Sequence, residues 1–277
     1  MKIMKFGGTS VGKPERMHQV YELITKDAES KIVVLSALSG TTNALVDISN
    51  SLSAGNKTEA KQKIDTLEAH YHAFVLDLLK TEALIAKGNA IIKEHFEFLN
   101  IITKISFSDA LNKDILAQGE LMSTKLFCCY LEQQGQDHLL LPALDFMVLD
   151  QNEEPDLPLI RSKLTALLAA HASTKIFITQ GYICRNAKGE VDNLKRGGSD
   201  YTASLIAAAV QASVCEIWTD IDGMHNNDPR VVDKTVAIEQ LSFDEAAELA
   251  YFGAKILHPS SVLPAKQKNI PVRLLNT

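Results

Sequence analysis

Two double-glycine segments carry residue types that could hold a phosphate. The first is Lys5-Phe6-Gly7-Gly8, which ends an apolar run, and the second is Arg196-Gly197-Gly198-Ser199-Asp200. Glycine lets backbone amides approach an anion closely, and a lysine or arginine adds a full positive charge. A tight turn whose glycines only relieve a steric clash is the alternative for either segment alone. Two such segments in one chain favour a pair of anion-binding bends.

Two further polar clusters follow apolar runs. Residues 36–43 (SALSGTTN) are rich in hydroxyls and suit the lining of a polar pocket, although a plain Ser/Thr turn is the simpler reading of them alone. Residues 219–230 (TDIDGMHNNDPR) are acidic, but they lack the closing glutamate of a calcium loop. We interpret this second cluster as a loop that meets a nucleoside, with Arg230 turned toward phosphate.

The spacing of other residues excludes several chemistries. Gly7, Gly12 and Lys13 approach the spacing of a Walker A loop, but Pro14 has no hydroxyl with which to hold magnesium. The eight histidines show no paired spacing, so we expect no metal held by protein side chains. No nucleophile elbow is present. The cysteines lack Cys-x-x-Cys spacing, and we expect reduced, buried thiols at Cys128, Cys129, Cys184 and Cys215.

The elements that must position these clusters alternate along the chain. Short apolar, β-branched runs predict buried strands, and amphipathic stretches between them predict helices. This rhythm predicts an α/β fold, an αβα sandwich around a mainly parallel sheet. Because ligands bind beyond the carboxyl ends of such strands, the polar clusters should meet there. The predicted strands are 2–6, 31–35, 138–141, 175–179, 214–218 and 270–275.

Local signals fix several boundaries between these elements. Pro14 predicts the first position of a helix, and Ser242-x-x-Glu245 is a capping box that predicts a helix through Tyr251, ended by Gly253. Residues 182–195 predict a β-hairpin or a long loop, and a helix is expected from about 202 to 212. Residues 46–130 are almost wholly helical in pattern, which predicts a helical excursion within a single domain, 1–277.

Composition narrows the class of protein. The 277 residues include 28 Lys+Arg and 34 Asp+Glu, for a net charge of −6, and the pI is about 5.8. This balance argues against nucleic acid as the main partner, since no basic stripe is visible. No apolar stretch reaches the ~20 residues of a membrane helix. We therefore expect a cytoplasmic protein with no membrane partner.

Taken together, the motifs resemble the catalytic domain of the aspartate kinases, which have the amino acid kinase fold. The resemblance extends in order from residue 2 to about 264. It implies transfer of the γ-phosphate of ATP, with Mg²⁺, to the side-chain carboxylate of L-aspartate, a step toward lysine, threonine and methionine. It also implies small regulatory ACT domains that this chain lacks, and a possible homo-oligomer. The segments that carry it are 5–12, 36–43, 118–120, 196–201, 218–230 and 252–259.

The resemblance implies a role for each matching position. Lys5, Asp200 and Lys255 are the implied catalytic residues, with Asp200 orienting Lys5 or the metal. Glu120 would meet the α-ammonium of aspartate and Arg196 its α-carboxylate. The other implied substrate contacts are Ser36, Thr42 and Ser199. The implied ATP contacts are Lys5, Phe6, Gly7, Gly8, Thr219, Asp220, His225, Arg230 and Lys255.

The sequence also departs from the pattern that it resembles. Lys195 stands where the family more often has glycine, Asp192-Asn193-Leu194 replaces a threonine-rich stretch, and His225 replaces a common tyrosine. Two alternatives remain open. One is a kinase of the same fold with another acceptor, and the other is an amino-acid sensor that binds without transferring phosphate.

Overall fold

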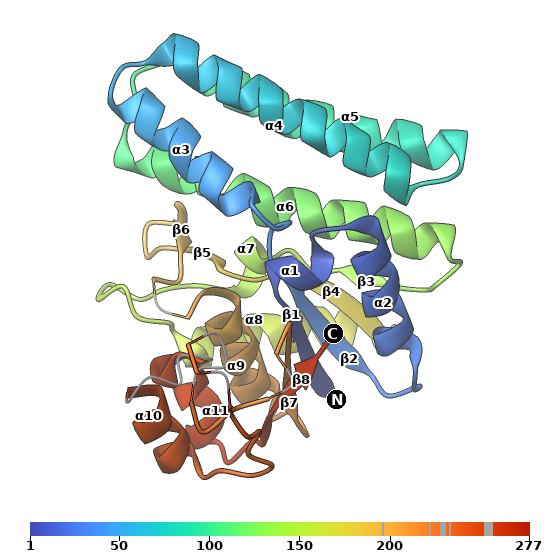
Figure 1. Cartoon of the computed structure of the whole chain (residues 1–277), viewed down its shortest axis with the longest axis vertical. Coiled ribbons are helices and arrows are strands. Elements are labelled where there is room, and N and C mark those ends of the chain that lie inside the picture. Colours follow the sequence, from blue (N-terminus) through green and yellow to red (C-terminus); the bar gives the residue numbers. More distant parts are fainter. Residues whose placement is uncertain (196, 222, 228–230, 233, 252–256) are drawn as a thin grey trace.

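A six-stranded parallel sheet forms the centre of the molecule (Figure 1). The computed structural model describes residues 1–195, 197–221, 223–227, 231–232, 234–251 and 257–277. The strand order is β3-β4-β2-β1-β7-β8, and every neighbouring pair is parallel. The strands are β1 (Lys2–Phe6), β2 (Lys31–Leu35), β3 (Leu139–Leu140), β4 (Ile176–Gln180), β7 (Cys215–Thr219) and β8 (Val272–Asn276).

Helices cover both faces of this sheet, which confirms the predicted αβα sandwich. Alternate residues of each strand point to opposite faces. In β1, Met4 and Phe6 belong to one buried apolar cluster with α2 (Pro14–Thr25) and α6 (Asp109–Gln133). Ile3 belongs to a second buried cluster, with α8 (Leu157–Ala170) and α9 (Gly198–Val210). The described residues also form the helices α1 (Gly8–Val11), α7 (Ala143–Phe146), α10 (Phe243–Tyr251) and α11 (Leu263–Gln267), and a 3-10 turn, Pro259–Val262.

The predicted helical excursion is a stack of helices on one side of the sheet. It comprises α3 (Thr41–Ser53), α4 (Lys57–Leu78), α5 (Glu82–Ile102) and α6, with α3 and α6 nearer the sheet and α4 and α5 beyond them (Figure 1). The hydroxyls of Thr81 and Ser108 cap α5 and α6 by accepting backbone N–H groups. Because α6 also packs on β2 and β4, the excursion is continuous with the core.

Several boundaries follow the predictions and one differs. Pro14 begins α2, and the capping box of Ser242 and Glu245 forms reciprocally at the start of α10. The segment 182–195 is a hairpin of β5 (Ile183–Arg185) and β6 (Val191–Asn193). Helix α9 begins at Gly198 rather than near residue 202, because Gly197 has a positive φ of 70° and turns the chain directly into the helix. Ser199 and Asp200 therefore lie in the first turn of α9.

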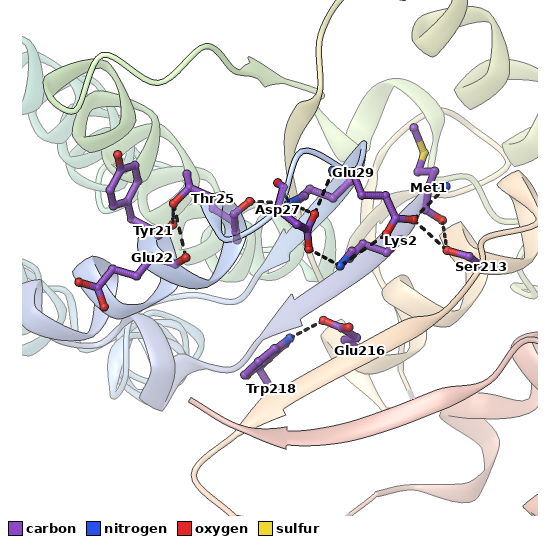
Figure 2. A network of polar contacts seen from close by, with 12 residues as sticks. Met1, Lys2, Tyr21, Glu22, Thr25, Asp27, Glu29, Ser213, Glu216 and Trp218 are labelled. Atoms are coloured by element: carbon purple, nitrogen blue, oxygen red, sulfur yellow. Dashed lines mark hydrogen bonds and ion pairs between the residues drawn. The ribbon is translucent and has the colours of Figure 1, made fainter.

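Charged side chains tie together the amino ends of the central strands (Figure 2). Lys31, the first residue of β2, is only 1% exposed, and its ammonium donates to Ile24 O (2.6 Å), Asp27 O (2.9 Å) and Asp27 Oδ1 (3.0 Å). Lys2, the first residue of β1, donates to Asp27 Oδ2 (2.7 Å). The Asp27 carboxylate thus joins two neighbouring strands at this end.

Two further expectations concern thiols and membranes. Cys129, Cys184 and Cys215 are buried free thiols, as expected, whereas Cys128 is only partly buried. Among the described residues, no helix has the length and apolar character to cross a membrane.

Candidate functional site

Lys5 and Asp200 meet at the carboxyl end of the central strand. Strand alternation turns Lys5 toward the α9 side of the sheet, and the first turn of α9 supplies Asp200. Lys5 Nζ lies 2.7 Å from Asp200 Oδ1, and both side chains are mostly shielded from solvent. Because β1 lies between β2 and β7, which are reached by crossovers in opposite directions, this ion pair occupies the switch point of the sheet.

The first glycine bend follows β1 directly and packs against the next strand end. Gly7 N–H donates to Trp218 O at the end of β7 (3.4 Å), and a Cβ on Gly7 would lie 3.5 Å from Lys5 Nζ. A Cβ on Gly8 would lie 3.0 Å from Ala37 O, so glycine permits close packing of the two strand-end turns. Phe6 stacks on half-buried Trp218, with ring centroids 5.7 Å apart.

Ser36 and Ser199 connect the end of β2 to the start of α9. The Ser36 hydroxyl donates to Ser199 Oγ at 2.9 Å. A Cβ on Gly181, just after β4, would lie 2.3 Å from Ser199 Oγ, so only glycine fits beside this serine. The two serines predicted to hold substrate are thus neighbours, although 163 positions separate them in the chain.

Glu120 is a buried carboxylate that points at the same strand end. It lies on α6, its residue is 3% exposed, and its Oε1 accepts a long hydrogen bond from Ala37 N–H (3.4 Å). Its Oε2 is buried and has no hydrogen-bond partner. Burial raises the pKa of the Glu120 carboxyl to about 8, since desolvation penalises the charged form. A buried acceptor without a donor costs free energy unless a group from outside the protein supplies the donor.

Other polar groups lie near the strand end at which Glu120 points. Ser123, one helical turn further along α6, donates to Ser36 O (2.8 Å). Burial and the nearby Glu120 raise the pKa of Tyr182 to about 12. Thr41 shares a buried 3.0 Å hydrogen bond with Tyr71, whereas the predicted substrate contact Thr42 is half-buried beside it in the first turn of α3.

The predicted nucleotide loop begins at the carboxyl end of β7. Thr219 ends that strand, and its hydroxyl donates to the exposed Asp220 carboxylate (3.0 Å). His225 is buried, and its Nδ1 lies 2.8 Å from Thr235 Oγ1. The hydrogen bond between Gly7 and Trp218 brings the start of this loop beside the first glycine bend. Arg196, Arg230, Lys255 and Gly253 lie outside the described residues.

Two more polar residues at this strand end, Ser123 and Gln180, were not predicted from the sequence. Ser123 lies three positions after Glu120, a spacing that places both on one helix face, and this signal could have identified it. Gln180 accepts from Ala143 N–H (2.8 Å) and donates to Thr124 Oγ1 (2.7 Å), which holds α6 against β4. No local motif marks Gln180, because its partners are distant in sequence.

Comparisons with known proteins agree with this geometry. The amino acid kinase family model matches residues 1–276. Lysine-sensitive aspartokinase 3 of Escherichia coli (strain K12) is 36% identical over 98% of this chain and 60% of its own length. Aspartokinase 3, chloroplastic, of Arabidopsis thaliana is 35% identical over 99% of this chain and 50% of its own.

A solved structure adds a match in three dimensions. The crystal structure of E. coli aspartokinase III in complex with aspartate and ADP superposes with a TM-score of 0.88 at 34% identity. The match covers 100% of this chain and 62% of that one. The chain therefore spans roughly half to three fifths of the length of these aspartokinases.

Proposed function

The chain belongs to the amino acid kinase family, and we propose that it is an aspartate kinase. The reaction would transfer the γ-phosphate of ATP to the β-carboxylate of L-aspartate, giving 4-phospho-L-aspartate and ADP. The similarity to aspartokinases over nearly the whole chain supports this acceptor. The product would enter the biosynthesis of lysine, threonine and methionine.

The observation that carries the proposal is the buried, unpartnered oxygen of Glu120 near the glycine bend. A ligand ammonium would supply the hydrogen-bond donor that Oε2 lacks, and it would stabilise the charged carboxylate. The hydrogen-bonded pair of Ser36 and Ser199 lies beside the same strand end and offers hydroxyls to the rest of the amino acid. We propose that Arg196 holds the α-carboxylate in a forked pair.

We propose that Lys5 supplies a cation to the reacting groups, and its ion pair with Asp200 beside the first glycine bend supports this role. A carboxylate that attacks a phosphoryl group brings two anions together, so catalysis depends on positioning and on neutralising charge. Asp200 would hold the Lys5 ammonium in place, and Gly7 and Gly8 would let backbone amides approach the phosphates. The β-carboxylate of aspartate is ionised at pH 7, so the reaction needs no general base. Lys255 would supply a second cation.

The residues of this strand end also fit Mg²⁺ bound with a nucleotide. Among the described residues no group of three His, Cys, Asp or Glu side chains could hold a metal ion, but Mg²⁺ commonly takes one or two carboxylates together with substrate phosphates. Asp200 supplies such a carboxylate. The ion would neutralise charge on the transferring phosphoryl group.

An acceptor-dependence assay tests the proposal. Coupled ADP release by this chain would be measured with aspartate, with glutamate and with no acceptor. We expect turnover only with aspartate. Turnover with another acceptor would identify a kinase of the same fold with a different substrate. Binding of aspartate without any turnover would instead identify an amino-acid sensor.

A further inference from the structure

A lysine outside the proposed site ties the helix that carries Glu120 to the β5–β6 hairpin. Lys113 Nζ lies 2.7 Å from Asp192 Oδ1 and 3.4 Å from Asn193 Oδ1. The side chains of Lys113 and Asp192 are 25% and 13% exposed, so the ion pair is partly shielded from water. Packing of α6 on β6 accompanies this contact.

Both ends of the ion pair lead directly to proposed substrate contacts. Lys113 and Glu120 are seven residues apart on α6, so they lie on the same face of that helix. On the other side, Asp192 and Asn193 end β6, and only four residues separate Asn193 from Gly198, the first residue of α9. Ser199, the partner of Ser36, follows immediately.

Hydrogen bonds through Tyr182 also link the end of the hairpin to α9. Leu194 N–H donates to Tyr182 O (2.8 Å), and Tyr182 N–H donates to Thr202 Oγ1 in α9 (2.8 Å). The nearby Glu120 carboxyl contributes to the raised pKa of Tyr182. A shift of β6 relative to α6 would therefore move the turn before α9 relative to Glu120.

We infer that Lys113 is a positioning residue for the amino-acid substrate. Its ammonium holds the end of β6 against α6, and this sets the distance between Glu120 and the residues that begin α9. The inference rests on the proposed function, in which these two parts hold opposite ends of aspartate. It predicts an effect on aspartate binding that is separate from any effect on ATP or on folding.

Steady-state kinetics of Lys113→Met test this role, with Lys125→Met as a matched control. Lys125 lies on the same helix, its side chain is 27% exposed, and its ammonium contacts Glu94 (3.1 Å) and His95 (2.9 Å) of α5, away from the hairpin. For Lys113→Met we expect the KM for aspartate to rise roughly fivefold, the upper range for a partly exposed ion pair. The kcat and the KM for ATP should stay within about twofold of wild type. Lys125→Met should leave all three unchanged.

Two more variants separate positioning from a general structural role. Lys113→Arg can still reach Asp192, so its KM for aspartate should match that of wild type. Asp192→Asn should raise the KM for aspartate as Lys113→Met does, and it tests the same ion pair if Lys113→Met folds poorly. The inference is overturned if the KM for aspartate is unchanged in Lys113→Met and Asp192→Asn. It is also overturned if the KM values for aspartate and ATP rise together. Wild-type chain without aspartate-dependent ADP release would overturn the proposed function, and the inference with it.

Discussion

The two ends of the central strands both carry buried charge, but they treat it differently. At the amino end, the ammonium of buried Lys31 has three acceptors within 3.0 Å. The Asp27 carboxylate bridges it to Lys2, and Figure 2 shows Asp27 beside Lys2. At the carboxyl end, Lys5 meets Asp200, but Glu120 Oε2 has no donor. Charged groups with partners fix a structure, whereas a buried acceptor without a donor is costly unless a ligand completes it.

This difference indicates that the two ends of the sheet have separate roles, one in stability and one in binding. The amino end stabilises the fold without a ligand, and its residues should matter for unfolding and not for turnover. At the carboxyl end, Glu120 has a raised pKa and an oxygen without a hydrogen-bond partner. Such a group lowers the stability of the free protein but is available to bind a ligand. Substitutions at the two ends should therefore change different measurements.

Lys5→Ala should give the largest effect and act only on catalysis. Removal of the ammonium takes away charge stabilisation of the transition state, so kcat should fall by about 100-fold or more. The fold should survive, because Lys5 adds little apolar packing. Coupled ADP release measures kcat, and circular dichroism with thermal melting checks the fold. An unchanged kcat would remove Lys5 from the mechanism and weaken the contrast between the ends.

Glu120→Gln should act on aspartate binding. A neutral amide of the same shape cannot neutralise a ligand ammonium, so the KM for aspartate should rise about 30-fold. The KM for ATP should stay nearly constant. Isothermal titration of aspartate and kinetics with both substrates provide the measurement. Equal weakening of both substrates would show that Glu120 supports the fold and not the amino acid.

The pH dependence sharpens this prediction. The pKa of Glu120 is about 8 without ligand, so below pH 8 the Glu120 carboxyl is protonated in most molecules. This carboxyl must release its proton before it can pair with a ligand ammonium. The KM for aspartate should fall as pH rises from 6.5 to 8.5 in the wild-type chain. In Glu120→Gln this slope should be absent. A slope that persists in the variant would assign the titration to another group.

The contrast between the ends was only partly predictable from the sequence. Strand and helix periodicity predicted the parallel sheet, and the glycine-rich segments after β1 and before α9 predicted which strand ends would meet. The sequence could not reveal that α9 begins at Gly198, because this start depends on the positive φ of Gly197, at a position where the distant residue Ser261 leaves no room for a Cβ. Neither the ion pair of Lys113 with Asp192 nor that of Lys31 with Asp27 was predicted, because helix and strand packing decides such contacts.

Lys31→Met tests the amino end with a side chain of similar length. The change leaves the carbonyls of Ile24 and Asp27 without their donor, and we expect the free energy of unfolding to fall by about 2 kcal/mol. The kcat and both KM values should match wild type at a temperature where the variant is folded. Urea denaturation measures the loss. A change in KM without a change in stability would contradict the proposed division between the ends.

Asp27→Asn should have the smallest effect on stability, and the size of that effect should depend on pH. Hydrogen bonds from Lys2 and then Lys31 hold the pKa of the Asp27 carboxyl well below its usual range. A depressed pKa gives stability that is present above the unfolded value of 3.8 and is lost as pH falls through the folded value. Because this carboxylate is largely exposed, solvent screening limits the loss in Asp27→Asn at pH 7 to about 0.5 kcal/mol.

Urea denaturation of wild type and Asp27→Asn at pH 7 and pH 3 measures this difference. The two chains should differ at pH 7 and begin to converge at pH 3, because the Asp27 carboxyl of the unfolded wild type takes up a proton there while that of the folded chain stays charged. The expected difference is small because only part of the network depends on the Asp27 charge. Its backbone oxygen and that of Ile24 still hold Lys31. A difference that grows on acidification would mean that another carboxylate carries the charge at this end of the sheet.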